Sequence, residues 1–195
     1  MPEYAGPALP SPEWTAWARA TFVMPESRWA NANHAHLEGA IVGFVLSDIE
    51  PVRSGKVTLG QAELVTPAKS FAAGRKEAWC EDAFGALPDF LITLNFCYVQ
   101  ACADEGNTAA ICALVEHELR HCAQATDQNG DPKYDQHGNP MWTIAPHDIE
   151  EFFDVIERYG PANETLRRLT EAVAISPTLA PRRAAGTCGT CGGAL

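Results

Sequence analysis

The sequence predicts an α+β fold, because segments with strand character come before the most strongly helical segments of the chain. The apolar runs at residues 40–46 and 89–95 are rich in residues that favour strands, and residues 56–66 have a similar character. Residues 104–125 carry apolar side chains at helical spacing and form the most pronounced helical pattern in the chain. A small sheet followed by helices is therefore expected.

The other segments complete this expectation. Gly60, inside the strand at 56–66, indicates a β-bulge or a close approach by another part of the chain. A loop is expected around residues 72–76, and the Asn-Gly and His-Gly pairs predict a turn-rich loop at 127–139. No internal repeat is apparent. Further helices are expected at residues 12–20, 25–39, 146–160 and 162–175.

Length and composition predict one domain with short tails. The chain has 195 residues, of which 46% are hydrophobic and 20% charged, as in soluble globular proteins. We expect an N-terminal lead-in at residues 1–24, a single domain at 25–176 and a flexible C-terminal tail at 177–195.

Charge and hydropathy exclude some classes of partner. The net charge is −11 and no cluster of Lys and Arg stands out, so a nucleic-acid partner is not expected. No apolar run approaches the roughly 20 residues that span a bilayer, and the N-terminus lacks the pattern of a signal peptide. We therefore expect a cytoplasmic protein without a membrane partner. Reduced cysteines that serve as packing residues are expected at Cys80, Cys97, Cys102, Cys112 and Cys122.

The predicted helix at 104–125 contains the motif His117-Glu118-Leu119-Arg120-His121. Side chains four residues apart share one face of a helix, so His117 and His121 can bind the same Zn²⁺ ion. Glu118 is then placed to take a proton from a water that zinc activates, and to pass it to a departing amine. The motif predicts Glu118 as the catalytic residue of a zinc hydrolase.

A catalytic zinc site needs a third protein ligand and an open fourth position. His147 is our first candidate, because it begins a predicted helix whose polar face also carries carboxylates. Glu150 or Glu151 is the alternative, and Asp127 is a weaker one. If His147 is the ligand, the nearby carboxylates could instead orient the imidazoles.

Three blocks of sequence resemble the Putative phage metallopeptidase family: residues 87–95, the helix through His117 to Cys122, and residues 147–152. The resemblance covers about residues 30–160. It implies a minimal zincin, in which a small mixed sheet packs on the HExxH active-site helix and a second helix bears a ligand, similar to SprT-like and other cytosolic mini-zincins. It also implies a strand that pairs with extended substrate, for which residues 89–95 are the candidate.

The resulting expectation is a zinc-dependent peptidase that acts on a protein or peptide substrate. An alternative is a zincin-fold binding or regulatory protein of phage or prophage origin without turnover. Glu118 favours the enzyme, because a protein that only binds has no need of that carboxylate. A zinc hydrolase acting on a non-peptide amide is a third hypothesis. The sequence predicts no oligomeric state.

A few features remain outside this scheme. Cys188 and Cys191 form one Cys-x-x-Cys knuckle, which is half of a zinc ribbon. It can be interpreted as a remnant or idle tail, a metal site shared between two chains, or a local disulfide. His34 and His36 diverge on a helix and are interpreted as surface or core residues. Candidates for stabilising an oxyanion are Tyr134, His137 and Tyr159.

Overall fold

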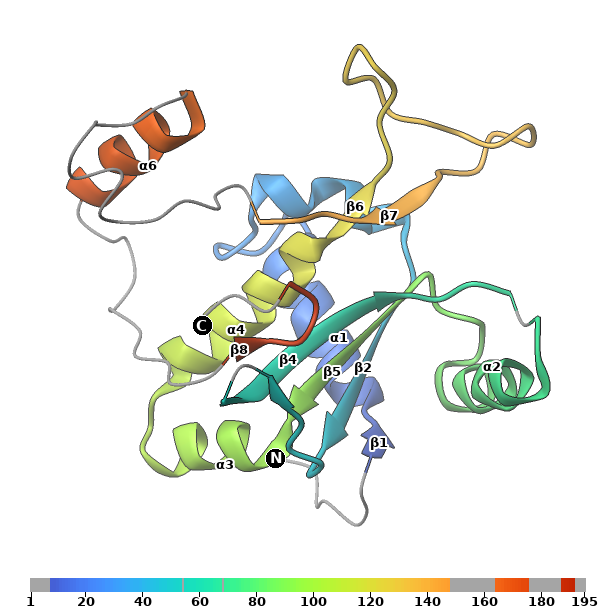
Figure 1. Cartoon of the computed structure of the whole chain (residues 1–195), viewed down its shortest axis with the longest axis horizontal. Coiled ribbons are helices and arrows are strands. Elements are labelled where there is room, and N and C mark those ends of the chain that lie inside the picture. The colour runs from blue at the N-terminus through green and yellow to red at the C-terminus, as the bar shows by residue number, and fades with distance from the viewer. Residues whose placement is uncertain (1–7, 54, 68, 148–163, 176–186, 192–195) are drawn as a thin grey trace.

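The structure is a computed structural model that describes residues 8–53, 55–67, 69–147, 164–175 and 187–191 (Figure 1). Its strands are β1 (Ala8–Pro10), β2 (Val42–Ser47), β3 (Val52–Arg53), β4 (Lys56–Leu64), β5 (Phe90–Asn95), β6 (Cys122–Gln124), β7 (Trp142–Ile144) and β8 (Thr187–Cys188). Its α-helices are α1 (Pro12–Ala18), α2 (Phe71–Phe84), α3 (Phe96–Asp104), α4 (Thr108–His121) and α6 (Glu164–Ala174). A π-helix, η1 (Arg19–Val23), and a 3₁₀-helix, η2 (Ala32–Gly39), complete the elements.

The main sheet is mixed and has the strand order β1-β2-β5-β4-β3, with β8 added to β4. β2 and β5 are parallel, with Phe44 opposite Ile92, whereas β5 and β4 are antiparallel, with Ile92 opposite Ala62. A separate two-stranded sheet joins β6 to β7. The α+β prediction is confirmed, and the small sheet that lies against α4 agrees with the zincin-like architecture.

Alternation along the strands divides the core between the two faces of the sheet. On one face, Phe44 of β2 and Phe90, Ile92 and Leu94 of β5 pack in the main core with buried residues of α1 and α4. On the other face, the smaller cluster contains Val45 and Leu91 from the sheet with Cys80 of α2. Helices therefore cover both faces, and α4 belongs to the larger core.

Three predicted boundaries were wrong. The loop expected at residues 72–76 lies inside α2, which Ser70 caps at its start and Gly85, at φ 77°, ends. The helix expected at 104–125 is α4 at Thr108–His121. Its cap is Asn107, one of the two caps that the sequence predicts, and residues Cys122–Gln124 form β6 instead of a last helical turn. Only residues 32–39 of the helix expected at 25–39 are helical, and the helix expected at 146–160 lies largely outside the described residues.

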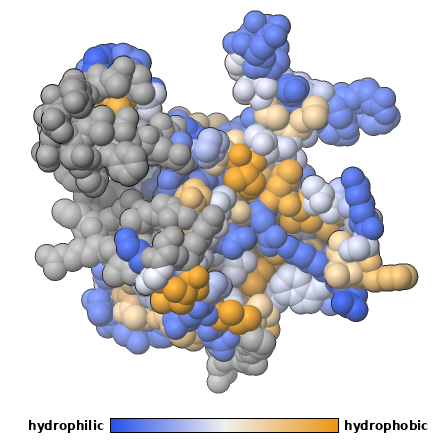
Figure 2. Space-filling model, viewed as in Figure 1, coloured by the Kyte–Doolittle hydropathy of each residue, from blue (hydrophilic) through white to orange (hydrophobic). Residues whose placement is uncertain are grey.

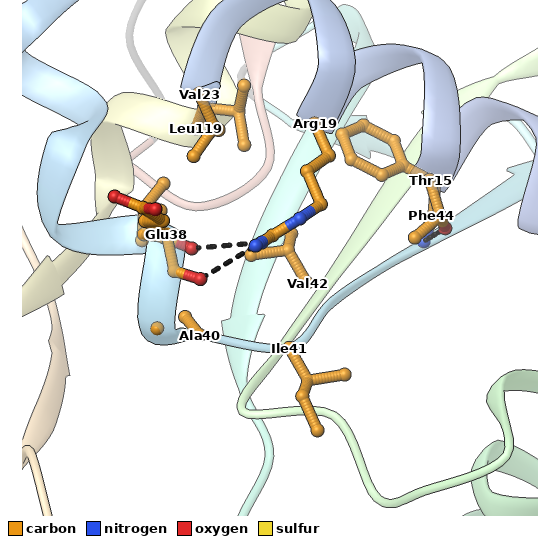
Figure 3. A pocket seen from close by; sticks show the side chains of 11 residues that line it. Thr15, Arg19, Val23, Glu38, Ala40, Ile41, Val42, Phe44 and Leu119 are labelled. Carbon is orange, nitrogen blue, oxygen red and sulfur yellow. Dashed lines mark hydrogen bonds between the residues drawn. The ribbon is translucent and has the colours of Figure 1, made fainter. Parts of the chain in front are cut away.

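The N-terminal segment is part of the core. Trp14, Ala18, Phe22 and Val23, which fall in the expected lead-in, are buried against the sheet and α4. Arg19 of η1 donates hydrogen bonds to the carbonyl oxygens of Leu37 and Glu38 at 3.4 and 2.7 Å, and so satisfies carbonyls at the end of η2 (Figure 3).

An arm projects from the body between β6 and β7, and its two tips are hydrophilic (Figures 1 and 2). It is a short tandem repeat, so the expectation of no internal repeat was wrong. Asp127 accepts backbone N–H bonds from Asn129 and Asp131, and Asp135 does the same for His137 and Asn139. Gly130 and Gly138 take positive φ values of 88° and 84° at equivalent positions. The predicted turns are therefore confirmed, as two copies of one turn.

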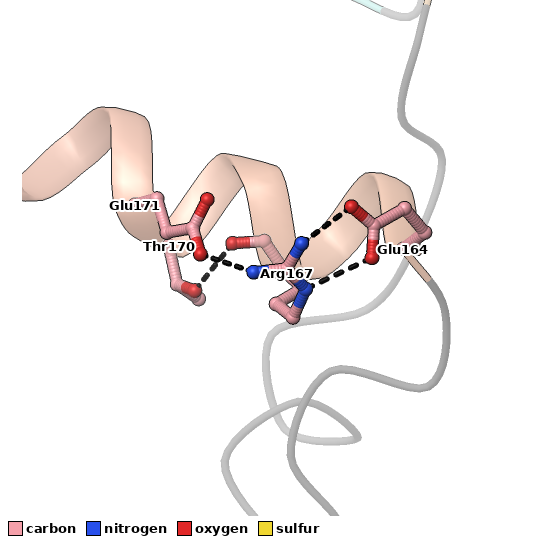
Figure 4. A network of polar contacts seen from close by, with 4 residues as sticks. All are labelled: Glu164, Arg167, Thr170 and Glu171. Atoms are coloured by element: carbon pink, nitrogen blue, oxygen red, sulfur yellow. Dashed lines mark hydrogen bonds and ion pairs between the residues drawn. The ribbon is translucent and has the colours of Figure 1, made fainter.

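Exposed ion pairs link side chains one helical turn apart on α6. Arg167 donates to Glu164 at 2.9 Å and also pairs with Glu171, at spacings of three and four residues (Figure 4). These side chains are exposed, so each pair contributes little to the folding free energy. None of the helices in the described part of the chain combines the length and hydropathy needed to cross a bilayer.

Candidate metal centre

Helix α4 positions His117, Glu118 and His121 within one turn. Asn107 caps the helix by accepting the N–H of Ala110, and a row of apolar residues anchors it in the main core. This row consists of Ala110, Ile111, Leu114, Val115 and Leu119. Because the apolar row fixes the rotation of α4, Glu118 and His121 are held in the buried part of the helix while His117 is half-buried.

The β6–β7 hairpin returns the chain to the end of α4. Cys122 is paired with Ile144 in this hairpin, and the N–H of Ala145 donates to the carbonyl oxygen of His121 at 2.8 Å. His147 follows two residues later and reaches the imidazole of His117. The hairpin thus closes a separation of 30 residues between His117 and His147.

The three imidazoles meet through their Nε2 atoms. Nε2 of His117 lies 3.3 Å from Nε2 of His121 and 3.2 Å from Nε2 of His147. With zinc–nitrogen bonds of about 2.0–2.1 Å, two ligands of a tetrahedral zinc are about 3.3 Å apart. The observed separations match this value, so the imidazoles fit one tetrahedral ion.

The hydrogen bond of His121 sets its tautomer. Nδ1 of His121 lies 2.7 Å from the carbonyl oxygen of Ala145, which can only accept a hydrogen bond. Nδ1 therefore carries the proton, and in the neutral ring Nε2 presents a lone pair to the other two imidazoles. A metal-ligating histidine commonly makes this kind of bond to a backbone carbonyl.

Glu118 is fully buried beside this cluster. Its Oε1 has no hydrogen-bond partner among the described residues, an unusual state for a buried oxygen. Burial is the main cause that raises the pKa of Glu118 to about 9, and the neighbouring Cys188 adds to the effect. A cation held by the imidazoles would oppose this shift, since nearby positive charge favours the carboxylate.

Strand β4 forms the wall next to Glu118. A β-carbon at Gly60 would lie 2.6 Å from Oε1 of Glu118, so the close approach predicted from Gly60 is confirmed. The candidate for a substrate-pairing strand, residues 89–95, was wrong. That segment is β5, which pairs with β2 on one side and β4 on the other and so has no edge to offer. The strand beside the motif is β4.

A hollow of about 340 Å³ opens above the imidazoles, lined by His117, Arg120, His121, Ala145, Pro146 and His147. A second hollow of about 330 Å³ lies over η1 and η2 (Figure 3). Its lining is mostly aliphatic and includes no histidine or cysteine. Of these two hollows, the one above the imidazoles has the lining that suits a metal centre.

The remaining residues predicted for the site lie in the arm between β6 and β7 or outside the described residues. Asp127 lies in the arm, where backbone N–H groups of Asn129 and Asp131 lower its pKa. Tyr134 and His137 are exposed in the same arm. The alternatives Glu150, Glu151 and Tyr159 lie outside the described residues.

His34, His36 and most of the predicted packing cysteines have structural positions away from the three imidazoles. His34 is buried with its Nε2 3.8 Å from Glu116, and Nε2 of His36 contacts the carbonyl oxygen of Cys122 at 2.8 Å. Of the cysteines expected to pack in the core, Cys80, Cys102 and Cys122 are buried and Cys112 is half-buried. Cys97 is exposed, contrary to expectation.

The C-terminal segment at residues 187–191 reaches the site, which was not predicted. Sγ of Cys188 lies 3.3 Å from Nε2 of His121, and Sγ of Cys191 lies 3.0 Å from Nε2 of His147. The ligand atoms of Cys191 and the three imidazoles all lie within 4.8 Å of one another. The Cys-x-x-Cys spacing suggested an idle remnant, a metal site shared between two chains or a local disulfide, and no sequence pattern connected these cysteines with the HExxH motif.

Comparison with known proteins gives one finding. The family model described as "Putative phage metallopeptidase" matches residues 15–174. No curated protein and no solved structure matches the chain. The match spans α1 to α6 and includes every residue of the histidine cluster.

Proposed function

Because the chain belongs to the Putative phage metallopeptidase family, we propose that it is a zinc-dependent peptidase whose metal is held by His117, His121 and His147. The observation that carries this proposal is the convergence of three Nε2 atoms, at 3.2 and 3.3 Å from the central one, beside a buried carboxylate. Zinc suits this donor set, because imidazole is among its preferred ligands and its sites are tetrahedral.

Glu118 is the proposed general base. When bound, zinc lowers the pKa of water toward about 7 and polarises a substrate carbonyl. Oε1 of Glu118 is without a protein partner among the described residues, so it can accept the proton of the attacking water. The protonated side chain then donates to the nitrogen that leaves when the peptide bond breaks. Because Glu118 is buried against Gly60, its carboxylate is held on the β4 side of the three imidazoles.

Strand β4 is the proposed substrate platform. Its residues from Thr58 to Ala62 run past Glu118, and their backbone groups can pair with an extended chain. Pairing of this kind recognises a peptide mainly through its backbone. It therefore favours a protein or peptide substrate over a small amide, which has no strand to add.

The test compares two carboxylate variants of α4. Glu118→Gln should retain zinc and fold but lose hydrolysis of denatured casein by about 10²-fold or more, because only the base is removed. Glu116→Gln is the matched control, since Glu116 accepts a hydrogen bond from Asn31 at 3.0 Å and lies outside the cluster. It should keep its activity. Undiminished hydrolysis by Glu118→Gln would show that this carboxylate is not the base.

A further inference from the structure

The C-terminal segment at residues 187–191 lies along the substrate platform (Figure 1). β8 pairs in parallel with β4, with Thr187 opposite Thr58 and Cys188 opposite Gly60. The pairing continues beyond the strand, because the N–H of Gly189 donates to the carbonyl oxygen of Gly60 at 2.6 Å. The segment therefore takes the backbone positions that an added peptide would use.

Thr190 extends this docking by one more step. Its hydroxyl accepts the N–H of Ala62 at 2.6 Å and lies 3.0 Å from the carbonyl oxygen of Ala62. The same hydroxyl lies 3.3 Å from Oε2 of Glu118, and its single proton can serve either acceptor. Thr190 therefore both fixes the segment to β4 and contacts Glu118, the proposed base.

The two cysteines take different places over the cluster. Sγ of Cys188 is buried and lies 3.7 Å from Oε2 of Glu118, to which it can donate. Sγ of Cys191 lies within 4.8 Å of the ligand nitrogens of all three imidazoles. Among the described residues, Cys188 forms such a group with His117 and Glu118. Cys191 is therefore the better placed of the two to complete a tetrahedron with the histidines.

The close fit of the segment depends on Gly189. A β-carbon there would lie 2.8 Å from Cβ of Gln61 and 2.8 Å from Cγ2 of Thr58. Both atoms are near the backbone of β4, so they cannot move aside easily. A larger residue at position 189 is expected to lift the segment from β4 without altering either thiol.

We propose that residues 187–191 are an inhibitory segment: they occupy the peptide-binding edge of β4, and Cys191 supplies the fourth ligand of the metal. Three imidazoles and a thiolate complete a tetrahedral zinc site and leave no open position for water. The peptidase is then latent until a competing chain displaces the segment. This inference rests on the proposed function for the histidines and Glu118, and deepens it by assigning regulation to the same site.

The ligand is tested with cobalt in the full chain. Co²⁺ bound to a thiolate shows a near-ultraviolet charge-transfer band that imidazole ligands do not give. Wild type and Cys188→Ala should show this band, while Cys191→Ala should lose it and still bind about one Co²⁺ per chain. A band that persists in Cys191→Ala overturns the assignment. Loss of all cobalt from Cys191→Ala would instead show that the histidines do not suffice, which contradicts the proposed function.

Inhibition is tested by activity of the full chain with zinc. Cys191→Ala and Gly189→Val should each raise kcat/KM on denatured casein by about tenfold or more, because a tethered segment competes at an effective concentration in the millimolar range. Adding Glu118→Gln to Cys191→Ala should abolish this gain. Equal activity of wild type and both variants overturns inhibition but leaves the peptidase proposal standing. Absence of hydrolysis from every variant contradicts the proposed function itself.

Discussion

The carboxylate of Glu118 lies directly against the backbone of Gly60. A β-carbon at residue 60 would lie 2.6 Å from Oε1, 2.9 Å from Cγ and 3.0 Å from Cδ of Glu118. Helix α4 and strand β4 can approach this closely only because residue 60 has no side chain. Since Glu118 is fully buried, its side chain has no exposed space into which it could move.

Gly60→Ala should therefore displace Glu118 and reduce peptidase activity by about tenfold or more, because small misplacements of a catalytic group are costly. Overpacking should also lower the free energy of unfolding by about 1–3 kcal/mol. Zinc content should stay unchanged, since the three atoms nearest to the added β-carbon all belong to Glu118. Activity assays and urea denaturation measure the two effects.

Gly39→Ala is the control for this substitution, because a β-carbon there would meet nothing within 4 Å. It should leave activity unchanged and alter the unfolding free energy by about 0.5 kcal/mol or less. Wild-type activity in Gly60→Ala would mean that the position of Glu118 does not matter for hydrolysis.

The third ligand is tested by zinc affinity. His147→Ala should weaken zinc binding strongly, because it removes one of three converging nitrogens. Glu150→Ala and Glu151→Ala should weaken it less, by at most the roughly 10–100-fold typical of residues that orient ligands. Competition with a chelator measures each affinity, and Asp127→Ala, in the exposed arm, is the unaffected control.

If Glu150→Ala or Glu151→Ala releases zinc while His147→Ala does not, the third ligand is a carboxylate. The proximity of His147 to His117 would then have another explanation, and the proposed donor set would be wrong.

The strands and the central motif could be predicted because each has a local signal. The strands β2, β4 and β5 coincide with runs of strand-favouring residues. In the HExxH motif, the four-residue spacing of the two histidines already indicates a helix. The cap of α4 at Asn107 was among the predicted ones, but helix α3 was not predicted. Residues 122–124 were predicted as helix, because their strand conformation depends on pairing with β7. Helix α2 was missed because its amphipathic pattern is weak and its first turn contains Gly74, which disfavours helix.

Contacts between distant segments could not be predicted from local pattern. His147 was a candidate from its sequence context, but its approach to His117 depends on the register of β6 and β7. The position of Cys188 and Cys191 beside the histidines was not predicted, because neither β8 nor β4 has a sequence pattern that indicates their pairing. Substrate pairing was assigned to β5 for the same reason: strand order is a tertiary property.

His34 should make folding sensitive to acid. It is 1% exposed and neither ring nitrogen has a hydrogen-bond partner among the described residues. Burial, followed by the charges of His36 and Arg120, lowers the pKa of His34 to about 4. The ordinary pKa of histidine is 6.5, so below this pH His34 is protonated in the unfolded chain but stays neutral in the folded protein. The free energy of unfolding therefore falls as pH falls from about 6.5 to about 4.

The measurement compares wild type with His34→Gln, which cannot titrate at this position. Between about pH 7.5 and about pH 5, wild type should lose about 2 kcal/mol more unfolding free energy than the variant. Urea denaturation at both pH values measures the difference, and acid effects at the histidines far from residue 34 cancel because both proteins share them. Equal losses would show that His34 is accessible to protons in the folded state.

The central claim is that His117 and His121 hold a metal ion together with His147, and zinc content tests it most directly. The measurement is elemental analysis of the Cys188→Ala/Cys191→Ala protein, in which the C-terminal thiols cannot bind metal, before and after adding His117→Ala/His121→Ala. We expect about one zinc per chain in the first protein and almost none in the second, because a single remaining imidazole cannot retain the ion. Full zinc content after both histidines are replaced would contradict the proposed metal centre.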